Sequence, residues 1–434
     1  MNNNPLSFIE GLEEFHKVAE KESPSWVHPW RMKGLARFKE MGLPTTRDEE
    51  WKYTNVKPIA QARFQLPSQD GLIDQAELEE YWSGQDLKIV FVNGLFSKDH
   101  SNLDHPPKGV HILNLPEAFR PYEKEITNLW KHYETKEGAF VSLHKAIFRQ
   151  GILIRIEPKA IVDKLLHIIH VTSSSPKEII CAPLTIVLVG ASSEVKILES
   201  HLAFSENLYF VNALSDVVMG ENSKVFYARA QKESPQAFHI STTRIWQKRD
   251  SQLNSFSFTT QGRITRNDLQ VSLDGVGASA ILNGLYSISE SQHVDNHTAV
   301  EHRLPSCTSN QFYKGILNDA SRAVFNGKIF VCRDAQQTNS YQLNKNLLLG
   351  KGCRADTKPQ LEIFANDVKC THGATIGQLN EDEIFYLQSR SISKDLAVKI
   401  LARGFIDDIL NTIPAESVKQ KLNTLLKDKF AQLI

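Results

Sequence analysis

The stretch from residue 151 to 378 is a long series of short strands separated by polar turns, and it restricts the possible folds more than any other feature. The series begins with the segments Ile152–Ile156, Leu166–Val171, Leu184–Val189, Val195–Leu198, Tyr209–Leu214 and Val225–Ala228. It continues to Ile363, and few parts of it could form a helix of about 10 residues or more. We therefore expect one large, mainly β unit here.

A weak repeat runs through this unit. The segment from Gly190 to Val195 returns 30 residues later as Gly220 to Val225, and Ser193 and Ser223 are followed by Ser251 and Ser279 at steps of 28. A turn followed by a strand at such a period is typical of a solenoid, which for an all-β chain is a parallel β-helix. A sandwich or barrel stays open as the alternative, because Asn-Gly pairs typical of hairpins begin at Asn93, Asn283 and Asn326.

Helical patterns lie on both sides of the β unit. Apolar residues at helical spacing begin at Phe8, and another helical stretch covers about 115 to 148. Near Thr46 the sequence has the form of a capping box, and we expect Trp51 and Tyr53 to anchor that region to the rest of the fold. The predicted division is 1–150 (helical and mixed), 151–378 (β core) and 379–434 (helical).

The C-terminal region has clear helix signals. Asn380 and Ser393 are suited to cap two successive helices, and the last helix carries Val418, Leu422, Leu425, Leu426, Phe430 and Leu433 at amphipathic spacing. These apolar stripes have two interpretations. They could pack against the β unit, or they could form a docking surface for another protein.

Composition excludes several classes of protein. Fifty basic residues balance fifty acidic ones, so the whole-chain charge predicts no nucleic-acid or membrane partner. No apolar run approaches the roughly 20 residues that span a bilayer, and the N-terminus has no signal-like pattern, so we expect a cytoplasmic protein. The five cysteines include no C-x-x-C pair, which argues against a disulfide framework or a zinc ribbon.

Common catalytic signatures are also missing from the sequence. It contains no phosphate loop, no G-x-G-x-x-G, no H-E-x-x-H and no G-x-S-x-G. Because polysaccharide-acting enzymes also use β-helices, two polar groups were considered as sites: Arg263, Arg266, Asp268 and Asp274, and His293, Asp295, His297, Glu301 and His302. We interpret both as turn chemistry and solvated charge, and we expect no enzyme.

The segment Asp367–Gln378 is the strongest candidate for function. If it is a strand, Cys370 and His372 lie on one face with apolar neighbours, because side chains alternate along a strand. Thiolate and imidazole both bind iron or zinc. The same pattern also fits two buried structural residues. Two ligands cannot hold an iron–sulfur cluster, which takes about four, so a metal role would need a second chain.

At this point the sequence resembles the SufB/SufD family of iron–sulfur cluster assembly proteins. The similarity covers most of the chain and is strongest from Thr298 to Phe405. Its motifs are Arg47–Thr54, His302, Asn310–Gly315, Phe325–Ile329, Gln336–Asn339, Asp356–Ile363, Asp367–Thr375 and Phe385–Arg390. SufB-like chains tend to carry His-Glu-Ala in the last strand, whereas this chain has His372-Gly373-Ala374 and so resembles the SufD branch.

The resemblance implies a right-handed parallel β-helix core between the two helical regions, and a scaffold role in a complex with SufB and the ATPase SufC. It implies no cofactor in the isolated chain, a transient cluster shared with SufB, and a homodimer when the chain is alone. His372 matches a histidine thought to contribute to the nascent cluster, Cys370 is a weaker candidate, and Cys353 aligns roughly with the assembly cysteine of SufB. We expect His372 to be buried at rest. The SufC contacts would come from the C-terminal helices: Phe385, Tyr386, Arg390, Ile392, Leu396, Ile400 and Phe405. A purely architectural partner, without a ligand role for His372, is the alternative.

Overall fold

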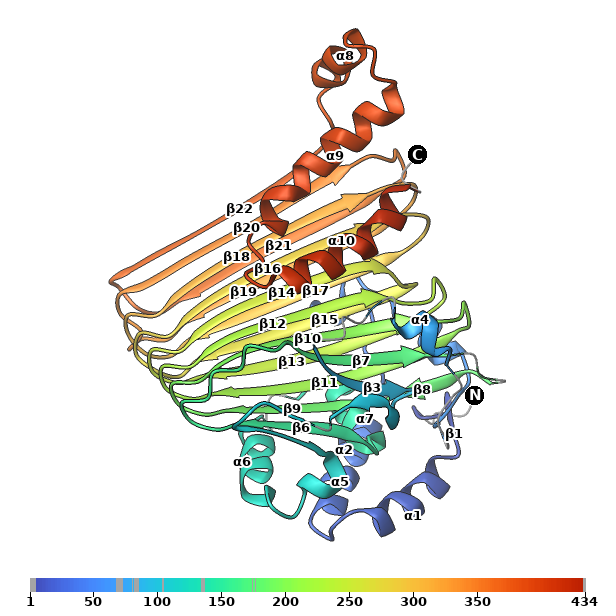
Figure 1. The fold of residues 1–434 in the computed structure, drawn as a ribbon, viewed down its shortest axis with the longest axis vertical. Helices are drawn as coiled ribbons and strands as arrows, with labels where there is room; N and C mark the ends of the chain where they lie inside the picture. Colours follow the sequence, from blue (N-terminus) through green and yellow to red (C-terminus); the bar gives the residue numbers. More distant parts are fainter. Residues whose placement is uncertain are drawn as a thin grey trace.

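The chain forms a parallel β-solenoid with helices at both ends (Figure 1). The computed structural model describes residues 5–67, 73–79, 81, 86–103, 105–133, 137–173, 175 and 177–431. Two long sheets form the walls of the solenoid, and the chain passes from one wall to the other at every turn. The prediction of a mainly β fold with a parallel solenoid core is confirmed, and the sandwich or barrel is excluded.

The strands are divided between a twelve-stranded sheet A and a ten-stranded sheet B. Sheet A holds β1 (Ile9–Glu10), β2 (Phe64–Gln65), β5 (Val110–Asn114), β6 (Gly151–Ile156), β8 (Ile179–Cys181), β9 (Leu184–Val189), β11 (Tyr209–Met219), β13 (Phe238–Gln247), β15 (Ile264–Leu273), β17 (His293–His302), β19 (Arg322–Val331) and β21 (Arg354–Ile363). Sheet B holds β3 (Leu87–Val92), β4 (Leu95–Asn102), β7 (Leu166–Thr172), β10 (Glu194–Ala203), β12 (Lys224–Lys232), β14 (Gln252–Gln261), β16 (Ser279–Ile288), β18 (Thr308–Leu317), β20 (Thr338–Leu348) and β22 (Val368–Gly377).

The turns explain the sequence repeat. In successive turns from sheet A to sheet B, one residue has a positive φ, as at Asn222 and Asp250, residue types that tolerate the left-handed conformation. The following serine then closes the turn, and Ser223 Oγ donates to the carbonyl of Gly220 at 2.7 Å. The predicted repeat is wrong at its last step, from Ser251 to Ser279. Ser279 pairs in register with Gln252, so Ala278 is the residue equivalent to Ser251. This coil is one residue shorter than the coil before it.

The N-terminal helices lie in different places. Five of those described gather at the end of the solenoid where β6 and β9 lie (Figure 1): α1 (Leu12–Glu22), α2 (Val27–Met41), α5 (Leu115–Ala118), α6 (Glu123–Tyr133) and α7 (Ala139–Ile147). A 3₁₀ helix (Glu49–Trp51), followed by α3 (Lys57–Gln61), lies across sheet A, and α4 (Gln75–Glu79) lies beside sheet B. Helix α2 packs closely on α7 at Gly34, where an added Cβ would lie 2.8 Å from the carbonyl oxygen of Ser142. The 3₁₀ helix begins after Asp48 rather than at the predicted cap, Thr46.

Three helices follow the last strand: α8 (Glu381–Ser389), α9 (Lys394–Leu410) and α10 (Glu416–Ala431). The predicted caps are confirmed, because Asn380 accepts from the Asp382 amide and Ser393 accepts from the Leu396 amide. Helix α10 lies against sheet B, with Val418 and Leu422 buried in a shared apolar cluster. The predicted stripe residue Leu433 lies outside the described residues. No helix in the described part of the chain combines the length and apolar character needed to cross a membrane.

Candidate functional site

The last coil of the solenoid, formed by β21 and β22, is uncovered. Among the described strands, β22 pairs only with β20 and β21 only with β19, so each has one edge without a strand partner. Unpaired edges of this kind are available to another chain. Large apolar side chains are exposed in the last two coils or directly beside them: Tyr341, Ile363, Phe364 and Ile376.

Cys370 and His372 lie on β22, and the predicted strand is confirmed. They pair in register with Ser340 and Gln342 of β20, whose side chains are buried inside the solenoid. Both residues therefore belong to the face that continues the lumen. The expectation that His372 is buried is wrong: it is exposed, because no further coil covers this face.

Cys370 differs from His372 in its surroundings. It is half-buried and packs against an apolar cluster that includes Ile329 and Val331. Burial raises the pKa of its thiol, which favours the protonated form over the thiolate that binds metals. As the coil stands, His372 is the more available of the two ligands.

Cys353 lies in the turn between β20 and β21, on the opposite edge of the solenoid from the turn that leads into Cys370. Its Sγ contacts the carbonyl oxygen of Gly350 at 2.8 Å, and one coil earlier Ser321 Oγ donates to the carbonyl of Asn318 at 2.7 Å. Because Arg322 and Arg354 are register partners, the two residues hold equivalent positions. The contacts of Cys353 thus account for it as a turn residue.

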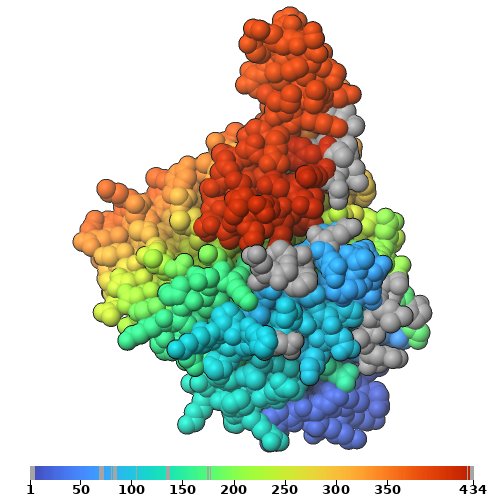
Figure 2. All heavy atoms as spheres, viewed as in Figure 1, coloured from blue at the N-terminus to red at the C-terminus, as the bar shows by residue number. Residues whose placement is uncertain are grey.

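The C-terminal helices divide into a packed part and a projecting part. Helix α8 and the first half of α9 project beyond the solenoid (Figures 1 and 2). We call these residues, 381–400, the helical tip. Four of its apolar side chains are 43–72% exposed: Phe385, Tyr386, Leu396 and Ile400.

The other three predicted contact residues have different surroundings. Arg390 is exposed and lies 5.3 Å from the centre of the Tyr386 ring, while Ile392 is half-buried. Phe405 is also half-buried, and it packs toward sheet B, where the ammonium of Lys314 lies 4.4 Å from its ring centre. The packing interpretation is therefore confirmed for Phe405 and α10, and docking stays a prediction for the helical tip.

The two polar groups flagged in the sequence come together on sheet A. Arg266 and Asp268 are register partners of Asp295 and His297, and residues 49–54 cross over them. The Arg266 guanidinium lies 3.8 Å from the ring centre of Trp51, as expected of an anchor. Arg266 and Asp295 are buried, so the interpretation as turns and solvated charge is wrong for them, whereas Arg263 is an exposed residue in the turn before β15, as predicted. These ions are buried because the N-terminal segment covers them.

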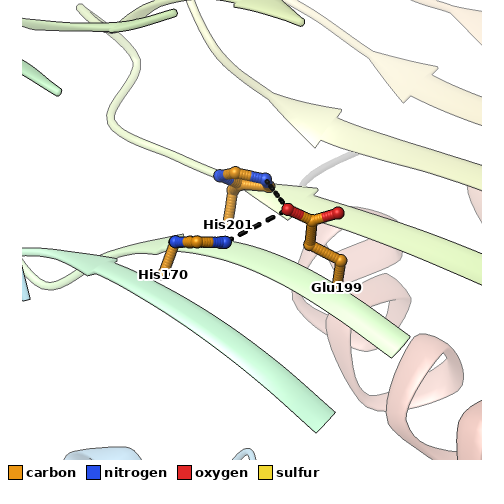
Figure 3. A group of neighbouring side chains, drawn as sticks. All are labelled: His170, Glu199 and His201. Carbon is orange, nitrogen blue, oxygen red and sulfur yellow. Dashed lines mark hydrogen bonds and ion pairs between the residues drawn. The ribbon is translucent and has the colours of Figure 1, made fainter. Parts of the chain in front are cut away.

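A third polar group lies inside the solenoid and was missed by the sequence analysis. Two imidazoles, His170 on β7 and His201 on β10, converge on one carboxylate oxygen of Glu199 (Figure 3). The Nε2–Oε1 distances are 3.1 Å from His170 and 3.7 Å from His201. We call these three residues the lumen triad; their side chains are all buried.

The triad continues into a second group of buried polar residues. His239 Nδ1 lies 2.7 Å from Glu233 Oε2, and the His239 ring meets that of His201 edge-on at 4.7 Å. Arg229 donates to His239 Nε2 at 3.1 Å. Burial raises the pKa of Glu233 to about 7, although His201 and Arg229 oppose this. Ionisable side chains are therefore concentrated in this part of the lumen, next to an apolar cluster that includes Ile168 and Ile197.

The protonation states of the triad follow from its surroundings. Burial lowers the pKa of His201 to about 3, so its imidazole is neutral. Burial alone would raise the pKa of Glu199, but its contacts with His170 and His201 hold it well below the ordinary value. The Ser215 hydroxyl also donates to Glu199, at 3.0 Å. The triad thus presents a neutral imidazole at His201 and a carboxylate at Glu199.

Comparisons with known proteins fit this architecture. Residues 170–405 match the family described as SUF system FeS cluster assembly, SufBD core domain, and residues 2–168 match the SufBD protein N-terminal region. An iron–sulfur cluster assembly SufBD family protein of Synechocystis is 31% identical, over 95% of this chain and 93% of the relative. The iron–sulfur cluster assembly protein SufD of Escherichia coli is 28% identical over 95% of each chain, and SufD of Bacillus subtilis is 22% identical over 97% of each.

Fold and site together define a β-solenoid protein with an uncovered last coil and a projecting helical tip. The chain belongs to the SufBD family of the SUF iron–sulfur cluster assembly system and is a SufD-type subunit. A role in iron–sulfur cluster assembly follows from this membership.

Proposed function

We propose that this chain is a scaffold subunit that completes a shared iron–sulfur assembly site with SufB and docks the ATPase SufC. It performs no catalysis itself and works in the cytoplasm. The observation that carries the proposal is the uncovered last coil, where His372 is exposed on the lumen-facing side of a strand with one unpaired edge. Iron and the forming cluster are cargo at this site.

SufB is the expected partner of the last coil. The free edges of β21 and β22 offer backbone hydrogen bonds to strands of another solenoid, and the exposed Ile376 and Phe364 offer apolar contacts. His372 supplies one ligand, and SufB supplies the others that a cluster requires. In the absence of SufB, a second copy of the chain occupies the same end and gives a homodimer.

The ligand role of His372 has a direct test. In a reconstituted SufB–SufC–SufD complex, cluster formation is followed by absorbance for the wild type, for His372→Ala, and for Thr371→Ala as the matched control. Thr371 is exposed on the same strand but faces the other way. We expect assembly to fall severalfold only for His372→Ala, with the complex intact. Unchanged assembly would refute the ligand role of His372, and only the architectural role of the chain would remain.

SufC is the expected partner of the helical tip. Phe385 and Tyr386 are large side chains that are exposed to solvent, and exposed apolar surface of this kind is typical of a binding site. Helix α8 also projects beyond the solenoid, where another protein can reach it (Figure 2). A groove of about 590 Å³ between α9 and α10, lined in part by Ile400, Arg403 and Phe430, extends this surface. Movement of SufC would reach the last coil through the short link between β22 and α8.

Point substitutions test the docking surface better than truncation. Deleting everything after Asn380 would also remove α10, whose Leu422 is buried in the cluster on sheet B. We expect the double variant Phe385→Asp, Tyr386→Asp to fold normally and to lose SufC in co-purification. Met41→Asp, at an exposed apolar residue of α2, is the control and should retain SufC. Full SufC binding by the double variant would refute the assignment.

A further inference from the structure

We propose that the lumen triad of His170, Glu199 and His201 binds one divalent first-row transition-metal ion inside the solenoid. One oxygen or nitrogen donor from each residue lies within 4.8 Å of the other two. Ligands that hold one zinc or iron ion at about 2.1 Å lie roughly 3.0–3.4 Å from one another. The observed contacts to Glu199 Oε1, 3.1 and 3.7 Å, therefore need little adjustment to accept an ion (Figure 3).

The hydrogen bonding of His201 points independently to a missing ligand. Its side chain is 1% exposed, and neither ring nitrogen has a hydrogen-bond partner among the described residues. Buried polar atoms in folded proteins nearly always have partners. Contrast His302, another buried lumen histidine, whose Nε2 is 2.9 Å from Ser309 Oγ. A metal on His201 supplies the partner that the described residues do not provide.

The charges around the triad suit a cation. Imidazole and carboxylate side chains are typical metal ligands, and the Ser215 hydroxyl holds the Glu199 carboxylate in place by donating to its other oxygen at 3.0 Å. Arg229, the register partner of Glu199 on β12, directs its hydrogen bonds to Ser241 and His239 rather than to Glu199. The Arg229–His239–Glu233 chain thus flanks the site without occupying its donors.

The donor set selects the class of metal. Two imidazoles and one carboxylate are typical ligands of zinc and of non-haem iron(II), and leave coordination positions open, whereas magnesium and calcium prefer oxygen ligands alone. The side chains are buried in the lumen, so we expect the ion to enter while the coils close and to be retained afterwards. The site is separate from the open end and does not depend on the proposed function.

The test is the metal content of the isolated full chain. The protein is produced in medium supplemented with Fe²⁺ or with Zn²⁺, passed over a chelating resin, and analysed by mass spectrometry for metal per chain. We expect close to one ion per chain in one of the two arms, and at least a tenfold loss in Glu199→Gln and His201→Gln. His302→Gln, a matched buried histidine, should keep the ion, as should the double variant Cys370→Ser, His372→Ala.

Folding of each variant is checked by circular dichroism, and His170→Gln serves as a milder variant if the others misfold. A Co²⁺-loaded sample adds a spectroscopic signature, because the visible absorption of the bound ion should disappear in His170→Gln. Metal-free wild type in both arms would overturn the proposal. So would a metal content that the folded triad variants share with the wild type.

Discussion

Alkaline pH should weaken the anchor that residues 49–54 form across sheet A. His297 Nε2 lies 3.0 Å from Asp295 Oδ1, and its Nδ1 lies 3.5 Å from a carboxylate oxygen of Glu50 and 4.0 Å from one of Asp268. Burial alone would lower the pKa of His297, but Asp295 outweighs it, against the opposing charge of Arg266, and the pKa rises to about 9. The imidazolium therefore favours the folded state.

The size of this stabilisation follows from the shift in the pKa of His297. A rise from the ordinary value of 6.5 to about 9 corresponds to about 3 kcal/mol, at roughly 1.4 kcal/mol per unit of pKa. Because the folded-state pKa of His297 is raised, this stabilisation is fully present below pH 6.5 and is lost as the pH rises through 9.

Thermal and urea unfolding at pH 6 and at pH 9.5 measure this contribution. The wild type should exceed His297→Gln in unfolding free energy by about 3 kcal/mol at the lower pH and by little at the higher one. The substitution Lys358→Gln is the control: it removes an exposed ion pair of the same segment, with Glu49, and should have a small effect at both values. A gap between wild type and His297→Gln that does not change with pH would refute the reasoning.

Three further predictions concern stability and Cys353. Leu422→Ala should lower the unfolding free energy by about 2–5 kcal/mol in urea titration, because Leu422 is fully buried, whereas Phe385→Ala on the exposed tip should change it by no more than about 0.5 kcal/mol. Gly275→Ala should yield little folded protein on gel filtration, because its Cβ would lie 1.9 Å from the Arg249 amide nitrogen. Cys353→Ser should leave both folding and cluster assembly unchanged, because a serine hydroxyl can make the same turn contact; a loss of assembly would show that the thiol has a chemical role.

Local patterns in the sequence predicted the elements well where local forces decide them. Strand alternation and turn residues indicated the β core, and Asn380 and Ser393 cap the helices that they were expected to begin. The apolar stripes of the C-terminal helices predict either packing or docking, and the structure shows that Leu422 of α10 packs on sheet B while Phe385 of α8 is exposed. Amphipathicity identifies an apolar face but does not identify what covers it.

The misjudged residues are those whose surroundings come from distant parts of the chain. His372 has apolar neighbours on its strand, which suggested burial, but the chain adds no coil beyond it. Asp295 looked solvated, yet Thr54 and Arg266 cover and pair it. The sequence does contain a signal for the lumen triad. His170 and His201 are register partners, so the two histidines recur one coil apart in the repeat. Aligning the repeat for polar residues at equivalent positions would have found it.

Bound iron and sulfide in the assembled complex test the central claim most directly. The chain is co-expressed with SufB and SufC, as wild type, as His372→Ala and as Thr371→Ala, and each purified complex is analysed for both elements. The shared-site account predicts iron and sulfide in the wild type and the Thr371→Ala control, and a severalfold loss of both in an intact complex that carries His372→Ala. Equal iron and sulfide in all three complexes would contradict it.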